Sequence, residues 1–225
     1  MATLYIIGTP IGNLGDITFR AIETLKSVDV ILCEDTRVTK KLLNTYDIQK
    51  PTLSYHSHSG LAKVEKIFEL LRDNKNLALV SDAGTPTISD PGSLLISRIK
   101  KELPEVSVVP IPGPSAVISA LSASGLSTGD FLFLGFLPHK KGRETLFAEI
   151  AKEKHAVVFY ESPHRLIKTL QSLNKHANEK TVVVVRELTK IYEEFKKGSA
   201  EELLAYFTEH TEKVRGEITI IVAPI

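Results

Sequence analysis

The sequence predicts an α/β protein built from two domains, each with its own sheet. In the first half, short apolar runs alternate with segments of helical periodicity, which is typical of βαβ units and a mainly parallel sheet. In the second half, only residues 187–191 separate two late apolar runs, which are expected to pair antiparallel in a mixed sheet. A Pro-rich stretch at 110–114 divides the halves. We therefore expect domains at 1–112 and 113–225, with a ligand cleft between them.

The first domain is expected to contain five strands joined by four helices. Its first helical segment has apolar residues at 17, 21, 22 and 25, which lie on one helical face. The strands are Leu4–Ile7, Val30–Cys33, Thr52–Tyr55, Leu77–Val80 and Val106–Ile111, and the helices are Ile17–Leu25, Val38–Tyr46, Val64–Leu71 and Leu94–Lys101.

The second domain is expected to open with a helix of small residues and to continue with five strands and three further helices. The opening helix is Ser115–Ser124. The strands are Phe131–Gly135, Ala156–Tyr160, Thr181–Arg186, Tyr192–Lys197 and Glu217–Val222, and the helices are Glu144–Lys152, Arg165–Asn174 and Glu201–Glu209.

Composition indicates a globular protein with a full core. The chain has 225 residues, of which 43% are hydrophobic, and a net charge of +1, so contacts with a polyanion would depend on local basic patches. The one cysteine, Cys33, lies in an apolar run and reads as a buried, inert thiol. Neither a targeting segment nor an apolar run of membrane-spanning length is evident. We expect a cytoplasmic protein with no membrane partner.

Three Gly/Pro-rich loops follow predicted strands directly, at Gly8–Asp16, Ser81–Gly92 and Pro112–Ala116. Loops at the carboxyl ends of parallel strands are where open α/β sheets bind ligands. Glycine lets the backbone approach a ligand closely, and proline stiffens the loop. The part we assign to a ligand is 82–86, where Asp82 can accept hydrogen bonds from ribose hydroxyls or amines. The sequence thus predicts one small-molecule pocket.

Each of these motifs also has a purely structural explanation. The first loop lacks G-x-G-x-x-G and P-loop spacing, and it could be a tight turn between strand and helix. Pro112–Ser115 could simply start a helix, and Asp35 or Thr36 could cap one. Three charged clusters at strand ends nevertheless point to a shared polar site. They lie at 34–37, 160–166 and 186–190.

Two further loops are candidates for ligand binding. His56–Gly60 carries only two histidines and no third metal ligand at suitable spacing, so no metal is expected. Pro138–Arg143 is basic, and it is either a surface turn or a phosphate-binding patch.

Taken together, seven ordered motifs resemble the class III, or tetrapyrrole-methylase-fold, methyltransferases over essentially the whole chain. Within that fold they are most similar to the branch that methylates ribosomal small-subunit RNA. The motifs are Gly8–Asp16, Glu34–Arg37, Ser81–Gly92, Pro112–Ala116, Phe136–Pro138 with Lys140 and Arg143, Tyr160–Arg165, and Arg186–Lys190 with Glu193 and Glu194.

The resemblance implies S-adenosylmethionine as methyl donor and the ribose 2′-OH of cytidine 1402 in 16S rRNA as acceptor, within the assembled small subunit. It also implies a homodimer, which is common in this fold. The cofactor-binding residues it implies are Gly8, Pro10, Asp82, Gly84, Thr85, Gly113, Ser115 and Ala116.

The same resemblance suggests roles in proton transfer and RNA binding. Acid–base or hydroxyl-positioning roles fall to Asp35, Glu187 or Lys190, and Lys190 would act as a base only if burial or Arg186 lowered its pKa. The expected RNA contacts are Arg37, Lys140, Lys141, Arg143 and Arg165.

The chain departs from the family pattern in two places. His56–Gly60 replaces a His-Glu-His-Asn-Glu run, and relatives commonly continue beyond the last strand into a helical extension. Two other functions remain open. One is C-methylation of a tetrapyrrole, and the other is a non-catalytic RNA-binding or ribosome-assembly role.

Overall fold

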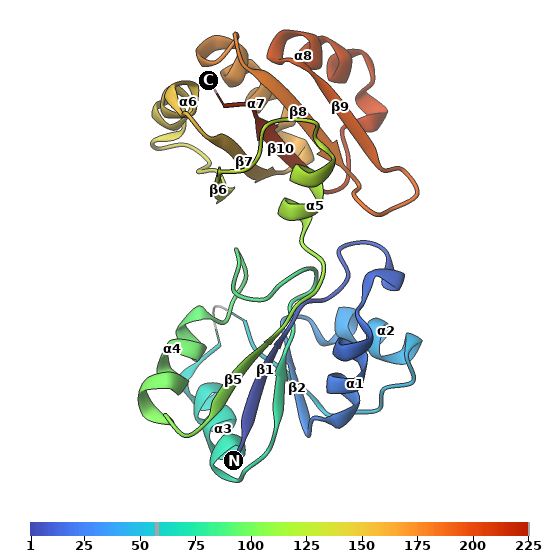
Figure 1. Ribbon diagram of the computed structural model, residues 1–225, viewed down its shortest axis with the longest axis vertical. Helices are drawn as coiled ribbons and strands as arrows, with labels where there is room; N and C mark the ends of the chain where they lie inside the picture. Colours follow the sequence, from blue (N-terminus) through green and yellow to red (C-terminus); the bar gives the residue numbers. More distant parts are fainter. Residues whose placement is uncertain (57–58, 225) are drawn as a thin grey trace. The chain divides into compact units, whose positions relative to one another are not determined.

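A computed structural model describes residues 1–56 and 59–224 (Figure 1). The chain divides into two compact units, residues 1–115 and 116–225. Ser57 and His58, part of the His56–Gly60 loop, lie outside the described residues.

The first unit contains a five-stranded sheet in the order β3-β2-β4-β1-β5, and all four neighbouring pairs are parallel. This confirms the parallel sheet predicted from the alternating pattern. Pro110 lies in an edge strand, where the missing N–H interrupts no inner ladder. The strands are β1 (Thr3–Ile7), β2 (Val30–Cys33), β3 (Thr52–Ser54), β4 (Leu77–Leu79) and β5 (Ser107–Ile111).

Helices cover both faces of this sheet (Figure 1). Alternate residues of each strand point to opposite faces, so Leu4 and Ile6 pack with α3 (Leu61–Arg72) and α4 (Ser93–Glu102). Ile7 packs on the other face with α1 (Phe19–Ser27) and α2 (Thr36–Thr45). Both faces of the strands are therefore buried, as a parallel sheet requires.

The starts of α1 and α2 differ from the sequence-based bounds because capping residues fix them. Thr18 accepts a hydrogen bond from the Ala21 N–H, so α1 begins at Phe19, and a short 3₁₀ turn, η1 (Leu14–Asp16), precedes it. The Asp35 carboxylate accepts from the Arg37 N–H and starts α2 at Thr36.

The second unit also has a five-stranded sheet, in the order β6-β7-β10-β8-β9. β6 and β7 are parallel, and the other three pairs are antiparallel. The predicted mixed sheet and the antiparallel pairing of the two late strands are both confirmed. The strands are β6 (Phe131–Phe136), β7 (Ala156–Glu161), β8 (Thr181–Arg186), β9 (Glu194–Ser199) and β10 (Ile218–Val222).

In this unit a single helix covers one face of the sheet and three cover the other. α5 (Ala116–Ala123) packs on Val158, Val183 and Ile221. The opposite face carries a larger apolar core that includes Phe147, Leu170 and Phe207. The elements on that face are α6 (Arg143–Lys152), α7 (Pro163–His176), α8 (Ala200–Glu209) and the 3₁₀ turn η2 (Thr211–Lys213).

Strand β9 begins at Glu194 rather than at Tyr192 because the preceding loop turns through left-handed conformations. Glu187 has φ 50° and Thr189 has φ 66°, and neither is a glycine. Helix α7 also starts earlier than predicted, since Pro163 occupies its first turn after Ser162.

None of the helices in the described residues is both long and apolar enough to cross a membrane.

Candidate functional site

The carboxyl ends of β1 and β5 bring two glycines into direct backbone contact. The Gly8 N–H donates to the Ile111 carbonyl at 3.2 Å. A Cβ on Gly113 would lie 2.7 Å from the Gly8 carbonyl oxygen, and one on Gly8 would lie 2.8 Å from the Gly113 Cα. The loops after β1 and β5 can pass this closely only because neither residue has a side chain.

A second backbone contact joins the loop after β1 to the loop after β4. The Thr9 N–H donates to the Gly84 carbonyl at 2.8 Å, and the Gly84 N–H donates to the Thr9 carbonyl at 3.1 Å. The buried Thr9 hydroxyl also lies 3.2 Å from the Ser81 carbonyl. Three of the sequence-predicted cofactor residues, Gly8, Gly84 and Gly113, are thus held in one cluster of loops.

The loop from Ser81 to Gly92 is held in an unusual backbone conformation. Gly84 and Gly92 have φ angles of 80° and 133°, and Thr87 and Ser89, which carry side chains, have φ angles of 75° and 64°. Non-glycine residues in this region are strained, and such strain is concentrated at ligand-binding and catalytic sites.

An acidic pocket of about 690 Å³ opens beside these loops. The Asp35 N–H donates to Asp82 Oδ1 at 3.1 Å and so links the loops after β2 and β4. Hydrogen bonds from Arg37 hold the pKa of Asp35 down at about 2, so this carboxylate is a weak proton acceptor. The pocket is lined by Glu34, Asp35, Thr36, Arg37, Ser54, His56 and Asp82.

Two neighbouring carboxyl groups have pKa values shifted in the opposite direction. Burial raises the pKa of Glu34, and the charge of Asp82 adds to the effect. Burial raises the pKa of Asp90 to about 6, and the charges of Glu34 and Asp82 raise it further. The site therefore crowds negative charge, which favours a ligand with cationic or hydrogen-bond-donating groups.

We expect Asp90→Asn to stabilise the protein above pH 6 and not at pH 4. The folded-state pKa of Asp90 lies above its usual value, so its stabilising contribution is present at low pH and is lost as the pH rises through about 6. Thermal unfolding should show a variant melting about 2–4 °C higher at pH 7.5, with almost no difference at pH 4. A difference that is independent of pH would contradict the assignment.

In the second unit, Glu187 and Lys190 form a compact ionic group with Glu217. Lys190 Nζ lies 3.0 Å from Glu187 Oε1 and 3.1 Å from Glu217 Oε2. Burial opposes the charged form of Lys190, but its hydrogen bonds to the two glutamates outweigh burial and raise its pKa. Burial also opposes the charged form of Glu187, but hydrogen bonds from Lys190 and from the Glu217 N–H outweigh burial and lower the pKa of Glu187. Lys190 is therefore an ammonium in this arrangement.

Two of the arginines expected to touch RNA, Arg143 and Arg165, meet at one buried carboxylate. Arg143 Nη2 lies 3.2 Å from Glu161 Oε2, and Arg165 Nε lies 2.6 Å from Glu161 Oε1. The Glu161 side chain has no exposed surface. Both guanidinium groups are thus engaged in the interior of the unit.

The remaining predicted residues lie in loops or at the starts of elements. Lys140 and Lys141 are exposed in the turn before α6, and the Arg37 side chain is 87% exposed. Thr85 is half-buried in the strained loop and Pro10 is buried after β1. Ser115 ends the first unit, and Ala116 begins α5. Within the described residues, no three or more His, Cys, Asp or Glu side chains are grouped so that they could hold a metal ion.

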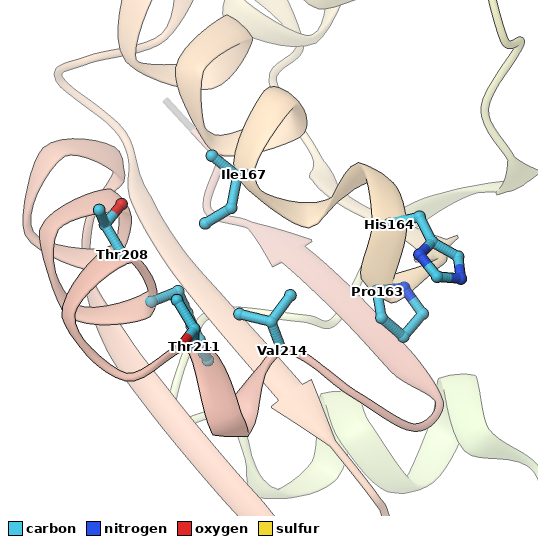
Figure 2. Close-up of a pocket in the computed structure, with 7 residues that line it drawn as sticks. Pro163, His164, Ile167, Thr208, Thr211 and Val214 are labelled. Carbon is cyan, nitrogen blue, oxygen red and sulfur yellow. The ribbon is translucent and has the colours of Figure 1, made fainter.

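A second pocket, of about 430 Å³, lies in the second unit and is lined by none of the residues predicted to bind the cofactor, to bind RNA or to act in catalysis. Figure 2 shows Pro163, His164 and Ile167 of α7, with Thr208, Thr211 and Val214 across from them. Its lining combines apolar side chains with His164, Thr208 and Thr211.

Sequence reasoning missed several residues that organise these sites. Thr9 and Glu161 lie within the motifs, and Glu217 begins a predicted strand, but the sequence assigns no role to any of them. Asp90 lies outside residues 82–86, the part of its loop that the sequence assigns to a ligand. Among these residues, only Glu161 gives a signal in the sequence. It is an acidic residue at the end of an apolar strand, and acidic residues are rarely buried without a partner.

A family profile described as tetrapyrrole (corrin/porphyrin) methylases matches residues 3–204.

Curated relatives include proteins named ribosomal RNA small subunit methyltransferase I. The Bacillus subtilis protein is 46% identical over 225 residues, with 99% of this chain and 75% of that protein covered. The Synechocystis protein is 46% identical, with 99% and 79% covered. The Thermotoga maritima protein is 45% identical over 223 residues, and 99% of each chain is covered.

Among solved structures, a cobalt-precorrin-4 methyltransferase of cobalamin biosynthesis matches with a TM-score of 0.71 at 20% identity and covers 98% of this chain and 94% of its own. A uroporphyrin-III C-methyltransferase from Thermus thermophilus matches with a TM-score of 0.66 at 16% identity and covers 99% of this chain and 94% of its own. At these identities the likeness establishes the fold alone.

Proposed function

Because this chain belongs to the tetrapyrrole methylase family, and within it to the ribosomal RNA small subunit methyltransferase I group, we propose that it methylates 16S rRNA. The chain is a methyltransferase, and a methyl donor is required. We propose S-adenosylmethionine as the donor and the ribose 2′-OH of a cytidine in the small ribosomal subunit as the acceptor. The proposal includes a cytoplasmic location and a homodimeric state.

The loops of the first unit suit such a donor. The Gly8–Gly113 contact and the Thr9–Gly84 bridge form a rigid backbone cradle that added Cβ atoms would obstruct. The Asp82 carboxylate and the acidic side chains around it complement a ligand that carries an amine, a sulfonium and ribose hydroxyls. We propose that the cofactor is held by Gly8, Pro10, Asp82, Gly84, Thr85, Gly113, Ser115 and Ala116.

When bound, S-adenosylmethionine would supply an activated methyl group for in-line displacement by an oxygen nucleophile. The protein's main contribution is then alignment of the two reactants and acceptance of the hydroxyl proton. The rigid glycine contact and the Asp35–Asp82 hydrogen bond serve alignment.

We propose that Glu187 accepts the proton of the ribose hydroxyl and that Lys190 orients Glu187. Glu187 is a carboxylate at neutral pH, whereas the raised pKa of Lys190 leaves it protonated and unable to act as a base. Asp35, whose pKa is about 2, is proposed as a hydrogen-bond acceptor that positions the hydroxyl. This assigns different tasks to the three residues for which sequence reasoning left the roles open.

Lys190→Met should lower methyl transfer to saturating RNA at least tenfold, since the carboxylate it orients would lose its position. Methionine keeps the length of the side chain without the charge. Single-turnover transfer of labelled methyl groups measures the effect, and donor affinity should stay within about twofold. Lys168→Met, at an exposed site on α7, is the matched control. Near-wild-type turnover in Lys190→Met would remove Lys190 from this role.

We propose that the exposed cations Arg37, Lys140 and Lys141 contact RNA phosphates. Each contact should contribute to affinity and to its dependence on salt. We propose that Arg143 and Arg165, whose guanidinium groups contact Glu161, affect RNA binding only indirectly.

The family assignment carries this proposal, and one assay tests it. Labelled S-adenosylmethionine is incubated with the protein and small ribosomal subunits from cells that lack the modification. The RNA is then digested and its nucleosides are analysed by mass spectrometry. A 2′-O-methylated cytidine absent from the control without protein is the expected result. If donor binding persists but RNA stays unmodified, the proposal fails, and assays of tetrapyrrole C-methylation and of subunit binding without catalysis would follow.

A further inference from the structure

A buried charged cluster in the second unit has no part in the methyl transfer proposed above. At its centre is Glu161, the last residue of β7, whose carboxylate contacts Arg143, Arg165 and Thr169. The Thr169 hydroxyl donates to Glu161 Oε2 at 2.5 Å and accepts from Arg143 Nη2 at 2.6 Å. Four side chains from β7, α6 and α7 thus form one network.

Both arginines of this network also bind the backbone of the loop that leads from β6 to α6. Arg143 Nη1 donates to the Pro138 carbonyl at 3.1 Å, and Arg165 Nη1 donates to the Leu137 carbonyl at 3.0 Å. Consecutive carbonyls are therefore held by two guanidinium groups that share one carboxylate. The turn that follows, His139–Gly142, carries Lys140 and Lys141 and is called the basic turn below.

The basic turn is fixed at both of its ends. Leu137 is 2% exposed on the side of β6, and Arg143 is 9% exposed at the start of α6. Gly142 has φ 80°, and the Arg143 N–H donates to the Lys140 carbonyl at 3.3 Å. The side chains of Lys140 and Lys141 are exposed between these two anchors.

Stability alone does not explain such a cluster. Burying charges is costly, and replacing a buried ion pair with apolar side chains of similar volume often leaves stability unchanged or improves it. A network of fixed geometry instead holds the attached backbone in one position. Here that backbone is the basic turn.

We propose that Glu161, Arg143, Arg165 and Thr169 are positioning residues that hold the basic turn in place so that Lys140 and Lys141 meet two RNA phosphates. This inference rests on the proposed function, since it takes RNA as the ligand. Ordering the turn before RNA arrives lowers the entropic cost of binding. The arginines act on RNA through the backbone of the turn, without touching the RNA.

A double-mutant cycle tests the proposal. Thr169→Val removes the hydroxyl that bridges Arg143 and Glu161 and keeps the shape of the side chain. It is combined with Lys140→Ala/Lys141→Ala, and the dissociation constant for undermethylated small subunits is measured over a range of salt concentrations. Lys152→Ala/Lys154→Ala, at the other end of α6, removes the same charge from exposed sites and is the control.

In the wild-type background, the Lys140/Lys141 substitutions should weaken subunit binding by about 30-fold and lower the salt slope by about 1.5. In the Thr169→Val background, the same substitutions should weaken subunit binding by about threefold or less, because Arg143 and Glu161 lose the hydroxyl that bridges them and the basic turn is held less firmly. Donor affinity should not change, and the control pair should have little effect in either background.

Equal effects of the lysine substitutions in both backgrounds would overturn the proposal, since a purely structural role of the cluster predicts additivity. No effect in the wild type would overturn it too, by showing that the basic turn does not contact RNA. Neither result bears on methylation by the wild-type protein. The proposed function is tested separately, by the nucleoside assay. Should Thr169→Val fail to fold, Arg143→Lys repeats the cycle, because it keeps the charge and loses the bond to the Pro138 carbonyl.

Discussion

Gly113→Ala should reduce affinity for S-adenosylmethionine by about 100-fold or more and destabilise the first unit by roughly 1–3 kcal/mol. The new Cβ would lie 2.7 Å from the Gly8 carbonyl oxygen and 2.9 Å from the Gly8 Cα. Because both contacts are with backbone, no rotation of a side chain can relieve them. The loops after β1 and β5 must separate, and the cradle built on them is lost. Calorimetric titration with the donor and thermal unfolding measure the two effects.

Gly60→Ala is the matched control for this substitution. A Cβ at Gly60 would meet no atom within 4 Å, and its φ of −66° suits any residue. This variant should bind the donor as the wild type does. Wild-type donor affinity in Gly113→Ala would show that the cofactor does not depend on this pair of loops.

The second large effect is expected for stability. Glu161→Ala should destabilise the second unit by about 3–5 kcal/mol, because it leaves two buried guanidinium groups without their shared counter-charge. In a protein of this size, the melting temperature should fall by roughly 10 °C or more. Thermal unfolding at pH 7 followed by circular dichroism is the measurement.

Glu144→Ala is the control, since Glu144 pairs with Lys175 and His176 on the surface and its side chain is 55% exposed. Removing an exposed partner leaves no buried charge, so its melting temperature should stay close to that of the wild type. Similar decreases in melting temperature in both variants would mean that the destabilisation by Glu161→Ala does not arise from the burial of the Glu161 carboxylate.

Much of the fold was predictable because each element carries its own periodic signal. The strands of the first unit are short, apolar and separated by amphipathic helices, and the order of these segments suffices for a parallel sheet. The antiparallel pairing of β8 and β9 followed from the short connection between them. The first and last residues of the helices and strands were harder to predict. The start of α1 depends on the Thr18 cap. The start of β9 depends on residues with left-handed backbone conformations, which no sequence pattern predicts.

The candidate site was predictable only where backbone chemistry showed in the sequence. The Gly/Pro-rich loops after β1, β4 and β5 were identified because strands must end before them, and a parallel sheet brings those ends to one edge. The sequence does not show in the same way which partner a charged side chain will have. Arg143 stands in a run of basic residues and reads as exposed, yet it turns inward to Glu161. The pairing depends on how α6, β7 and α7 pack against one another, and no periodic pattern in the sequence states that packing.

The glycine pair also has an evolutionary consequence. At Gly198, an added Cβ would meet the carboxylate oxygen of Glu202 at 2.8 Å, so a shorter residue at position 202 could compensate for a larger one at 198. Gly8 and Gly113 obstruct each other through main-chain atoms, which every amino acid possesses. No second substitution at either position can make room for the first. Both positions should therefore remain glycine as long as the two loops keep this contact. Position 198, in contrast, can change together with position 202.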